Sequence, residues 1–104
     1  MAATVKFRNR NMKQPRNIVG PRIKALRVER GLTQPMLAAK CQLHGWDLSR
    51  ETLAKIESQI RWVADAELVC LSKSLKVPVE GLLPAGAIAA KVLRVFFQRP
   101  VTGA

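Results

Sequence analysis

The sequence predicts an all-α fold in which five short helices surround a single core. Apolar residues recur at intervals of three and four from Ile18 to Leu83, which is the period of amphipathic helices. Aromatic residues make up only 5% of the chain and hydrophobic residues 48%, so aliphatic side chains must fill the core. Glycine, proline and hydroxyl residues interrupt the pattern where helices should begin and end. The 104 residues suffice for one domain with tails.

The first two helices are expected over residues 21–30 and from Thr33 to about Gly45. Gly31 suits a left-handed turn that closes the first helix. Thr33 is a good N-cap for the second helix, and Pro35 is tolerated in its first turn. The inward-facing apolar residues are Val19, Ile23, Leu26, Leu37, Ala38 and Cys41.

Three further helices follow at short intervals. Ser49 is expected to cap a third helix that runs to about Ser58. A fourth helix is predicted over residues 65–75, and Pro78 opens a short fifth helix that Pro84 stops. The apolar positions of these helices are Leu53, Ile56, Leu68, Leu71, Leu75, Leu82 and Leu83.

Basic residues greatly outnumber acidic ones, with 18 Lys and Arg against 7 Asp and Glu and a net charge of +11. This excess favours a polyanionic partner, with nucleic acid ahead of an anionic membrane surface. Residues 1–17 contain five basic groups and no acid. They are predicted to form a basic N-terminal arm, either a flexible solvated tail or a segment that follows DNA phosphates, ahead of a domain over residues 18–84.

Residues 85–104 form an apolar C-terminal tail whose structure the pattern leaves open. Ile88, Val92 and Phe96 share one helical face, yet the segment also alternates as a strand would. It is too apolar for an ordinary disordered tail. We expect it to dock on the domain or to form a dimer contact, with membrane association behind both.

The sequence carries no strong sign of an enzyme, a metal site or a cofactor. The single histidine, His44, has no Cys or Asp partner at ligand spacing. Cys41 and Cys70 are too few for a disulfide scaffold and lie at apolar helical positions, where reduced thiols behave as small hydrophobes. With no secretory signal and no apolar run of about 18 residues, we expect a cytoplasmic protein with no membrane span.

A series of short motifs runs in a fixed order through the predicted helices. They are Arg22 to Arg27, Gly31 to Gln34, Leu37 and Ala38, Ser49 to Leu53, Ile56 and Glu57, Leu75 to Val79, and Leu82 and Leu83. In this order the chain resembles the phage-repressor (Cro/C1-type, Xre) helix-turn-helix family over about two-thirds of its length. The resemblance implies a five-helix lambda-repressor-like domain. It also implies a transcriptional regulator, more specifically a repressor, that binds an inverted repeat of double-stranded DNA as a homodimer.

The third predicted helix is the candidate reading element. Arg50, Glu51, Thr52 and Lys55 lie on its polar sides. The major groove admits one helix, and there Arg and Lys donate to guanine O6 and N7 while Glu accepts from cytosine N4. The alternative is a solvated helix face; the position within the family favours base readout.

The resemblance also implies phosphate ligands and an internal ion pair. Gln34 matches a family position that binds a backbone phosphate, at a helix N-terminus whose free N–H groups favour an anion. Arg27 and Glu57 match positions that pair and would fix the angle of the reading helix. The expected phosphate ligands are Thr33, Gln34, Ser49, Ser58, Gln59 and Arg61.

The chain departs from the family pattern in three places. The turn over residues 42–48 is longer than usual, and Trp46 either fills the added space as a core residue or contacts DNA. Gln59 stands where glycine is common, so a left-handed turn there costs more. Ala64 replaces a hydroxyl cap, so Asp65 must cap the fourth helix or leave it uncapped. Trp62 is expected to cover the edge of the core.

Two other functions stay open at this point. In the first, an antitoxin-type protein binds DNA and neutralises a protein partner through its tail. In the second, a nonspecific nucleic-acid binder relies on the basic arm. For a regulator, the dimer surface is expected to involve Val79, Leu82, Leu83 and residues 92–97.

Overall fold

The computed structural model describes residues 14–98, and every regular element in that range is helical. The predicted all-α class is therefore confirmed. The elements are α2 (Gly20–Glu29), α3 (Gln34–Leu43), α4 (Arg50–Glu57), α5 (Asp65–Leu75), the 3-10 helix η1 (Val79–Leu82) and α6 (Gly86–Phe97).

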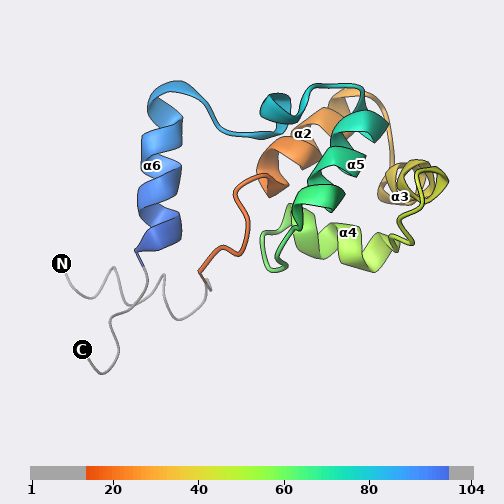
Figure 1. Ribbon diagram of the computed structural model, residues 1–104, viewed down its shortest axis with the longest axis horizontal. Helices are drawn as coiled ribbons and strands as arrows, with labels where there is room; N and C mark the ends of the chain where they lie inside the picture. Colours follow the sequence, from red (N-terminus) through yellow and green to blue (C-terminus); the bar gives the residue numbers. More distant parts are fainter. Residues whose placement is uncertain (1–13, 99–104) are drawn as a thin grey trace.

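Helices α2 to α5 and η1 surround one aliphatic core. Helix α3 packs against α4 and α5, and α2 packs against α4, α5 and η1. In Figure 1, α4 lies along the lower edge of this bundle, and α6 stands apart, joined to η1 by residues 83–85. The buried core residues are Val19, Ile23, Leu26, Leu37, Ala38, Cys41, Leu48, Leu53, Ile56, Cys70, Leu71, Leu75 and Leu82.

Local capping signals set most of the helix boundaries. The Thr33 hydroxyl accepts the Met36 N–H at 3.2 Å, and the Ser49 hydroxyl accepts the Thr52 N–H at 3.1 Å. Each bond satisfies one of the N–H groups that a helix leaves without an internal partner. Gly31 adopts a φ of +70°, as expected for the turn after α2.

Two details of the predicted helices are wrong. The fifth helix is a single 3-10 turn that ends at Leu82, so Leu83 lies outside it and is 37% exposed. Asp65 is the first residue of α5 and not its cap. Glu67 takes over that role, because its carboxylate reaches back to accept the N–H of Ala64 at 3.0 Å.

The C-terminal tail forms α6, so the strand alternative is wrong. None of the residues of α6 is buried. It is held at its far end, where Gln14 Nε2 donates to the carbonyls of Val95 at 3.3 Å and Gln98 at 3.0 Å. Phe96 meets Trp62 edge to face, with ring centroids 6.2 Å apart. Trp62 is 57% exposed and faces α6, so its interpretation as a cover for the core is wrong.

Both cysteine thiols are free and buried. Cys70 Sγ donates to the carbonyl of Cys41 at 3.7 Å. Burial raises the pKa of the Cys41 thiol to about 11, so this group stays protonated at neutral pH and packs as a small apolar side chain. Among residues 14–98, no helix is both long and apolar enough to cross a membrane.

Candidate nucleic-acid interface

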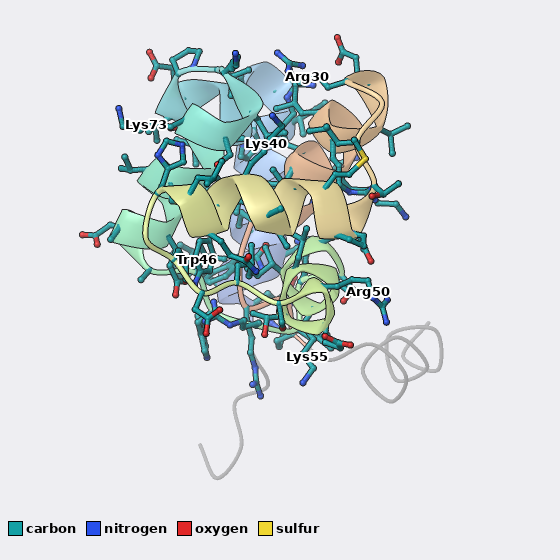
Figure 2. The ribbon with its side chains drawn as sticks, turned by 90° about the vertical axis from the view of Figure 1, so that its right-hand side faces the viewer. Arg30, Lys40, Trp46, Arg50, Lys55 and Lys73 are labelled. Carbon is teal, nitrogen blue, oxygen red and sulfur yellow. The ribbon has the colours of Figure 1, made fainter. Side chains whose placement is uncertain are left out.

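Helix α4 turns one face into the core and another to solvent. Leu53 and Ile56 are fully buried. Arg50 and Lys55 are exposed and point away from the bundle (Figure 2). Glu51 is also exposed, and Thr52 is half-buried; the Thr52 hydroxyl accepts a bond from the Ser49 hydroxyl at 3.1 Å.

The charged groups at the start of α4 form only a weak, exposed ion pair. Arg50 Nη2 lies 3.4 Å from Glu51 Oε2, and the two side chains are 55% and 70% exposed. Exposed ion pairs of this kind contribute little free energy because water screens them. Both groups can therefore exchange this contact for another polar partner at low cost.

Glu57, at the C-terminal end of α4, is the centre of a buried polar network. Its Oε2 accepts from Arg27 Nε at 2.7 Å, and its Oε1 accepts from Arg27 Nη2 at 3.1 Å. Arg27 Nη1 also donates to the carbonyl of Leu32 at 2.8 Å. The bidentate Arg27–Glu57 pair and the bond to Leu32 together join α2, the turn after it and α4. They therefore fix the orientation of the exposed face of α4.

Gln34, an expected phosphate ligand, belongs to the same network. Its Nε2 donates to Glu57 Oε1 at 3.1 Å. A side-chain amide carries two N–H donors, so this bond orients Gln34 and uses one of them. Thr33, another expected phosphate ligand, is occupied through its hydroxyl as the cap of α3.

The turn after α4 is built from internal hydrogen bonds. Gln59 adopts a φ of +68° although it is not glycine. Its N–H donates to the Ile56 carbonyl at 3.0 Å, and the next N–H, of Ile60, donates to the Lys55 carbonyl at 3.0 Å. These bonds satisfy carbonyls at the end of the helix and offset the cost of the left-handed residue. The Ser58 hydroxyl donates to the Ala54 carbonyl at 2.9 Å.

Arg61, a third expected phosphate ligand in this region, is engaged by Glu67. Arg61 Nη1 and Nη2 donate to the two carboxylate oxygens at 2.8 and 3.2 Å. This hydrogen-bonded pairing lowers the pKa of Glu67 and raises the pKa of Arg61. The Arg61 guanidinium also lies 5.9 Å from the ring centroid of Trp46. Trp46 is half-buried against the core, which is the first of its two expected roles.

Asn17 is a positioning residue that the sequence reasoning missed. It is only 6% exposed. Its Nδ2 donates to the carbonyls of Ile56 at 3.0 Å and Arg61 at 2.9 Å, and its Oδ1 accepts the N–H of Gly20 at 2.8 Å. Asn17 thus joins the start of α2 to both sides of the turn after α4. An Asn four residues before the predicted start of the first helix is a capping signal that could have revealed it.

Gly20 makes this junction sterically possible. A Cβ at this position would lie 2.3 Å from the Ile56 carbonyl oxygen and 2.9 Å from that of Glu57. Both neighbours are backbone atoms of α4, which cannot move aside without shifting the helix. The start of α2 therefore sits directly against the C-terminal end of α4.

His44 is exposed at the C-terminal end of α3. In residues 14–98, no group of three His, Cys, Asp or Glu side chains could hold a metal ion.

The arrangement is that of a helix-turn-helix domain, with α3 packed beside an α4 that carries exposed polar side chains. The sequence profile of the helix-turn-helix family matches residues 23–82, and the chain belongs to this family, of the Cro/C1 type related to Xre. The fold is accordingly lambda-repressor-like, and the protein is a DNA-binding regulator. No curated protein and no solved structure gives a significant match.

Proposed function

We propose that the protein is a sequence-specific transcriptional repressor that inserts α4 into the major groove of DNA. The observation that carries this proposal is the two-sided character of α4. Its inner side is held by the buried Arg27–Glu57 pair, with Nε and Oε2 2.7 Å apart. Its outer side offers Arg50 and Lys55 as donors for guanine and Glu51 as an acceptor for cytosine.

Backbone phosphates would be bound around this helix. The expected ligands are Thr33, Gln34, Ser49, Ser58, Gln59 and Arg61. Several of these side chains already form hydrogen bonds within the protein. We therefore propose that these residues hold N–H groups and positive charge in fixed positions around α4, and that they do not reach for phosphates as freely moving side chains. Arg61 would contribute the positive charge of its guanidinium beside the turn after α4.

The basic N-terminal arm would add a second contact with DNA. Residues 1–13 lie outside the described part of the chain and carry four Lys and Arg and no acid. The described chain begins beside the turn after α4, where the Arg16 N–H donates to the Gln59 carbonyl at 2.9 Å. This junction supports an arm that leaves the domain next to the reading helix and follows phosphates or a groove.

We further propose a cytoplasmic homodimer that binds an inverted repeat. Members of this class bind half-sites about one helical turn apart, on one face of the duplex. Leu93 and Phe97 are apolar and exposed in the single chain, and they lie within the expected dimer surface.

Selection of DNA from a randomised library by the purified full chain tests the proposal. A recovered palindrome would establish both base readout and two-fold symmetry. Recovery of unrelated sequences would instead favour the nonspecific binder.

An antitoxin-type role is the second candidate, because the apolar side chains of α6 are exposed. Phe97 is 71% exposed. If the tail neutralises a protein partner, Phe97→Asp should abolish that neutralisation, and retained DNA binding by the same variant would separate this contact from the dimer contact.

A further inference from the structure

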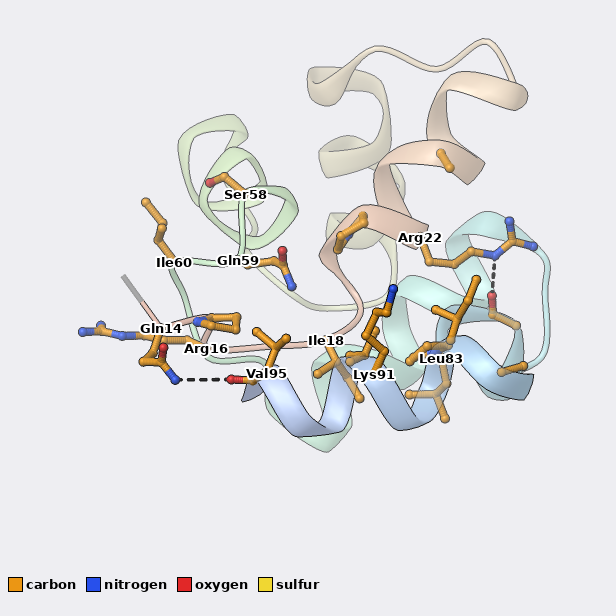
Figure 3. A pocket seen from close by; sticks show the side chains of 18 of the residues that line it. Gln14, Arg16, Ile18, Arg22, Ser58, Gln59, Ile60, Leu83, Lys91 and Val95 are labelled. Carbon is orange, nitrogen blue, oxygen red and sulfur yellow. Dashed lines mark hydrogen bonds between the residues drawn. The ribbon is translucent and has the colours of Figure 1, made fainter. Parts of the chain in front are cut away.

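An open groove of about 1340 Å³ separates α6 from the rest of the domain (Figure 3). One wall is the inner side of α6, with Ile88, Val92 and Val95. The opposite wall includes Ile18 and Leu83. Apolar side chains therefore lie on both walls.

The two walls do not cover each other. Ile88 is 65% exposed and Val95 46% exposed, although both line the groove. Apolar surface of this extent is unfavourable in water, and contiguous exposed apolar patches on soluble proteins mark sites of interaction. The groove is therefore shaped to receive an apolar face.

The charges that border the groove are mostly positive. Among the described residues that line it, Arg16, Arg22 and Lys91 are basic and Glu80 is acidic. Arg22 is held at the border because its Nε donates to the Gly81 carbonyl at 2.9 Å. A guanidinium has five N–H donors, so this bond leaves Arg22 able to bind a carboxylate.

The segments of this chain that could occupy the groove do not complement these charges. Residues 1–13 carry four basic groups and no acid. Helix α6 of a second copy would bring Lys91 and Arg94 and no acid. Placing either segment in the groove would set like charges together, which disfavours the contact.

We propose that the groove binds an amphipathic helix of a partner protein, with its apolar stripe against α6 and its acidic residues against Arg16, Arg22 and Lys91. The volume exceeds the roughly 300–1000 Å³ of usual small-molecule pockets. A helix about 10 Å across with side chains is a better match. This binding does not depend on DNA recognition by α4.

Fluorescence anisotropy with the full chain and three labelled synthetic peptides tests the proposal. The first peptide, of about four helical turns, carries Leu at helical spacing and Glu elsewhere. The second has the same composition in scrambled order, and the third replaces Glu with Lys. We expect the first peptide to bind roughly tenfold more tightly than either of the others.

Matched variants assign the binding to the groove. Val92→Asn removes one apolar group from the wall without changing charge, and we expect roughly tenfold weaker binding of the striped acidic peptide. Ala90→Asn, on the same helix but outside the groove lining, should leave binding unchanged. Lys91→Gln should weaken binding more than Arg94→Gln, since Arg94 does not line the groove.

Three outcomes would overturn the proposal. The first is equal binding of the striped and scrambled acidic peptides. The second is binding that Val92→Asn leaves intact. The third is a self-associated chain, detected by sedimentation, that Val92→Asn dissociates and Ala90→Asn does not, because the occupant would then be a second copy. Circular dichroism confirms that each variant remains helical.

Discussion

Arg27 and Glu57 lie 30 positions apart in the chain and form a two-pronged, nearly buried ion pair, with 2.7 Å between Nε and Oε2. Their side chains are only 11% and 4% exposed. The pair links α2 to the C-terminal end of α4, whereas Arg50 is exposed at the N-terminal end of the same helix. One contact thus serves both the fold and the orientation of the proposed reading helix.

Arg27→Ala should destabilise the protein by about 3–5 kcal/mol, since it leaves the Glu57 carboxylate buried without its guanidinium. Thermal unfolding followed by circular dichroism measures the effect. Arg50→Ala, which removes the exposed pair with Glu51, is the matched control and should cost at most about 1 kcal/mol. Equal losses for the two variants would contradict the structural role of Arg27.

Asn17→Ala should cost about 3 kcal/mol in unfolding free energy. The change removes the donor for two carbonyls and the acceptor for the Gly20 N–H, and buried polar groups left unpaired cost about 1–3 kcal/mol each. Chemical denaturation measures the loss. Gln42→Ala removes a single bond, from Nε2 to the Leu48 carbonyl at 2.8 Å on an exposed side chain, and should cost about 1 kcal/mol or less. A smaller loss for Asn17→Ala than for Gln42→Ala would show that Asn17 does not join the start of α2 to the turn after α4.

Gly20→Ala should also destabilise the protein, although alanine is usually the better helix former by about 1 kcal/mol. The added Cβ would meet the carbonyl oxygens of Ile56 and Glu57. Ala25→Gly, at an exposed position of the same helix, should follow the usual preference and lose about 1 kcal/mol. If Gly20→Ala raises the melting temperature, α2 and α4 do not approach each other as described.

The contribution of the Arg61–Glu67 pair should depend on pH. The hydrogen bonds from Arg61 lower the pKa of Glu67 below its ordinary value of 4.5 in the folded state. The resulting stabilisation is fully present above pH 4.5 and is lost as the pH falls through the lowered pKa. The difference in unfolding free energy between the wild-type protein and Glu67→Gln should therefore shrink on acidification. Arg61→Gln removes the largest cause of the lowered pKa and leaves the bond from the Ala64 N–H, so the same comparison made in that background should depend less on pH.

Arg50→Ala and changes in the N-terminal arm should affect DNA binding differently. For the preferred site, Arg50→Ala should cost about 1–3 kcal/mol and relax the preference at one base pair. Alanine at Lys6, Arg8 and Arg10 should weaken binding to all sequences and reduce the salt dependence by about 0.9 logarithmic units per lost phosphate contact. Titrations at several salt concentrations separate the two effects. A general loss of affinity for Arg50→Ala, with unchanged sequence preference, would exclude base reading by this residue.

The sequence by itself determined helices α2 to α5 and most of the core. Thr33, Ser49 and Gly31 act within one turn of chain, so their effects could be inferred without knowledge of distant residues. The repeat of aliphatic residues indicated which side of each helix is buried. The order of the motifs was sufficient to indicate the family.

Apart from the Arg27–Glu57 pair, which the family resemblance implied, only the tertiary structure decided which polar groups meet. Gln34 and Glu57 are 23 positions apart, and Asn17 reaches Ile56 across 39. No local pattern specifies such pairs, because they depend on how α2, α3 and α4 pack. The tail shows the same limit. Its apolar residues fit a helix or a strand, and the choice of helix and its separation from the core follow from the rest of the fold.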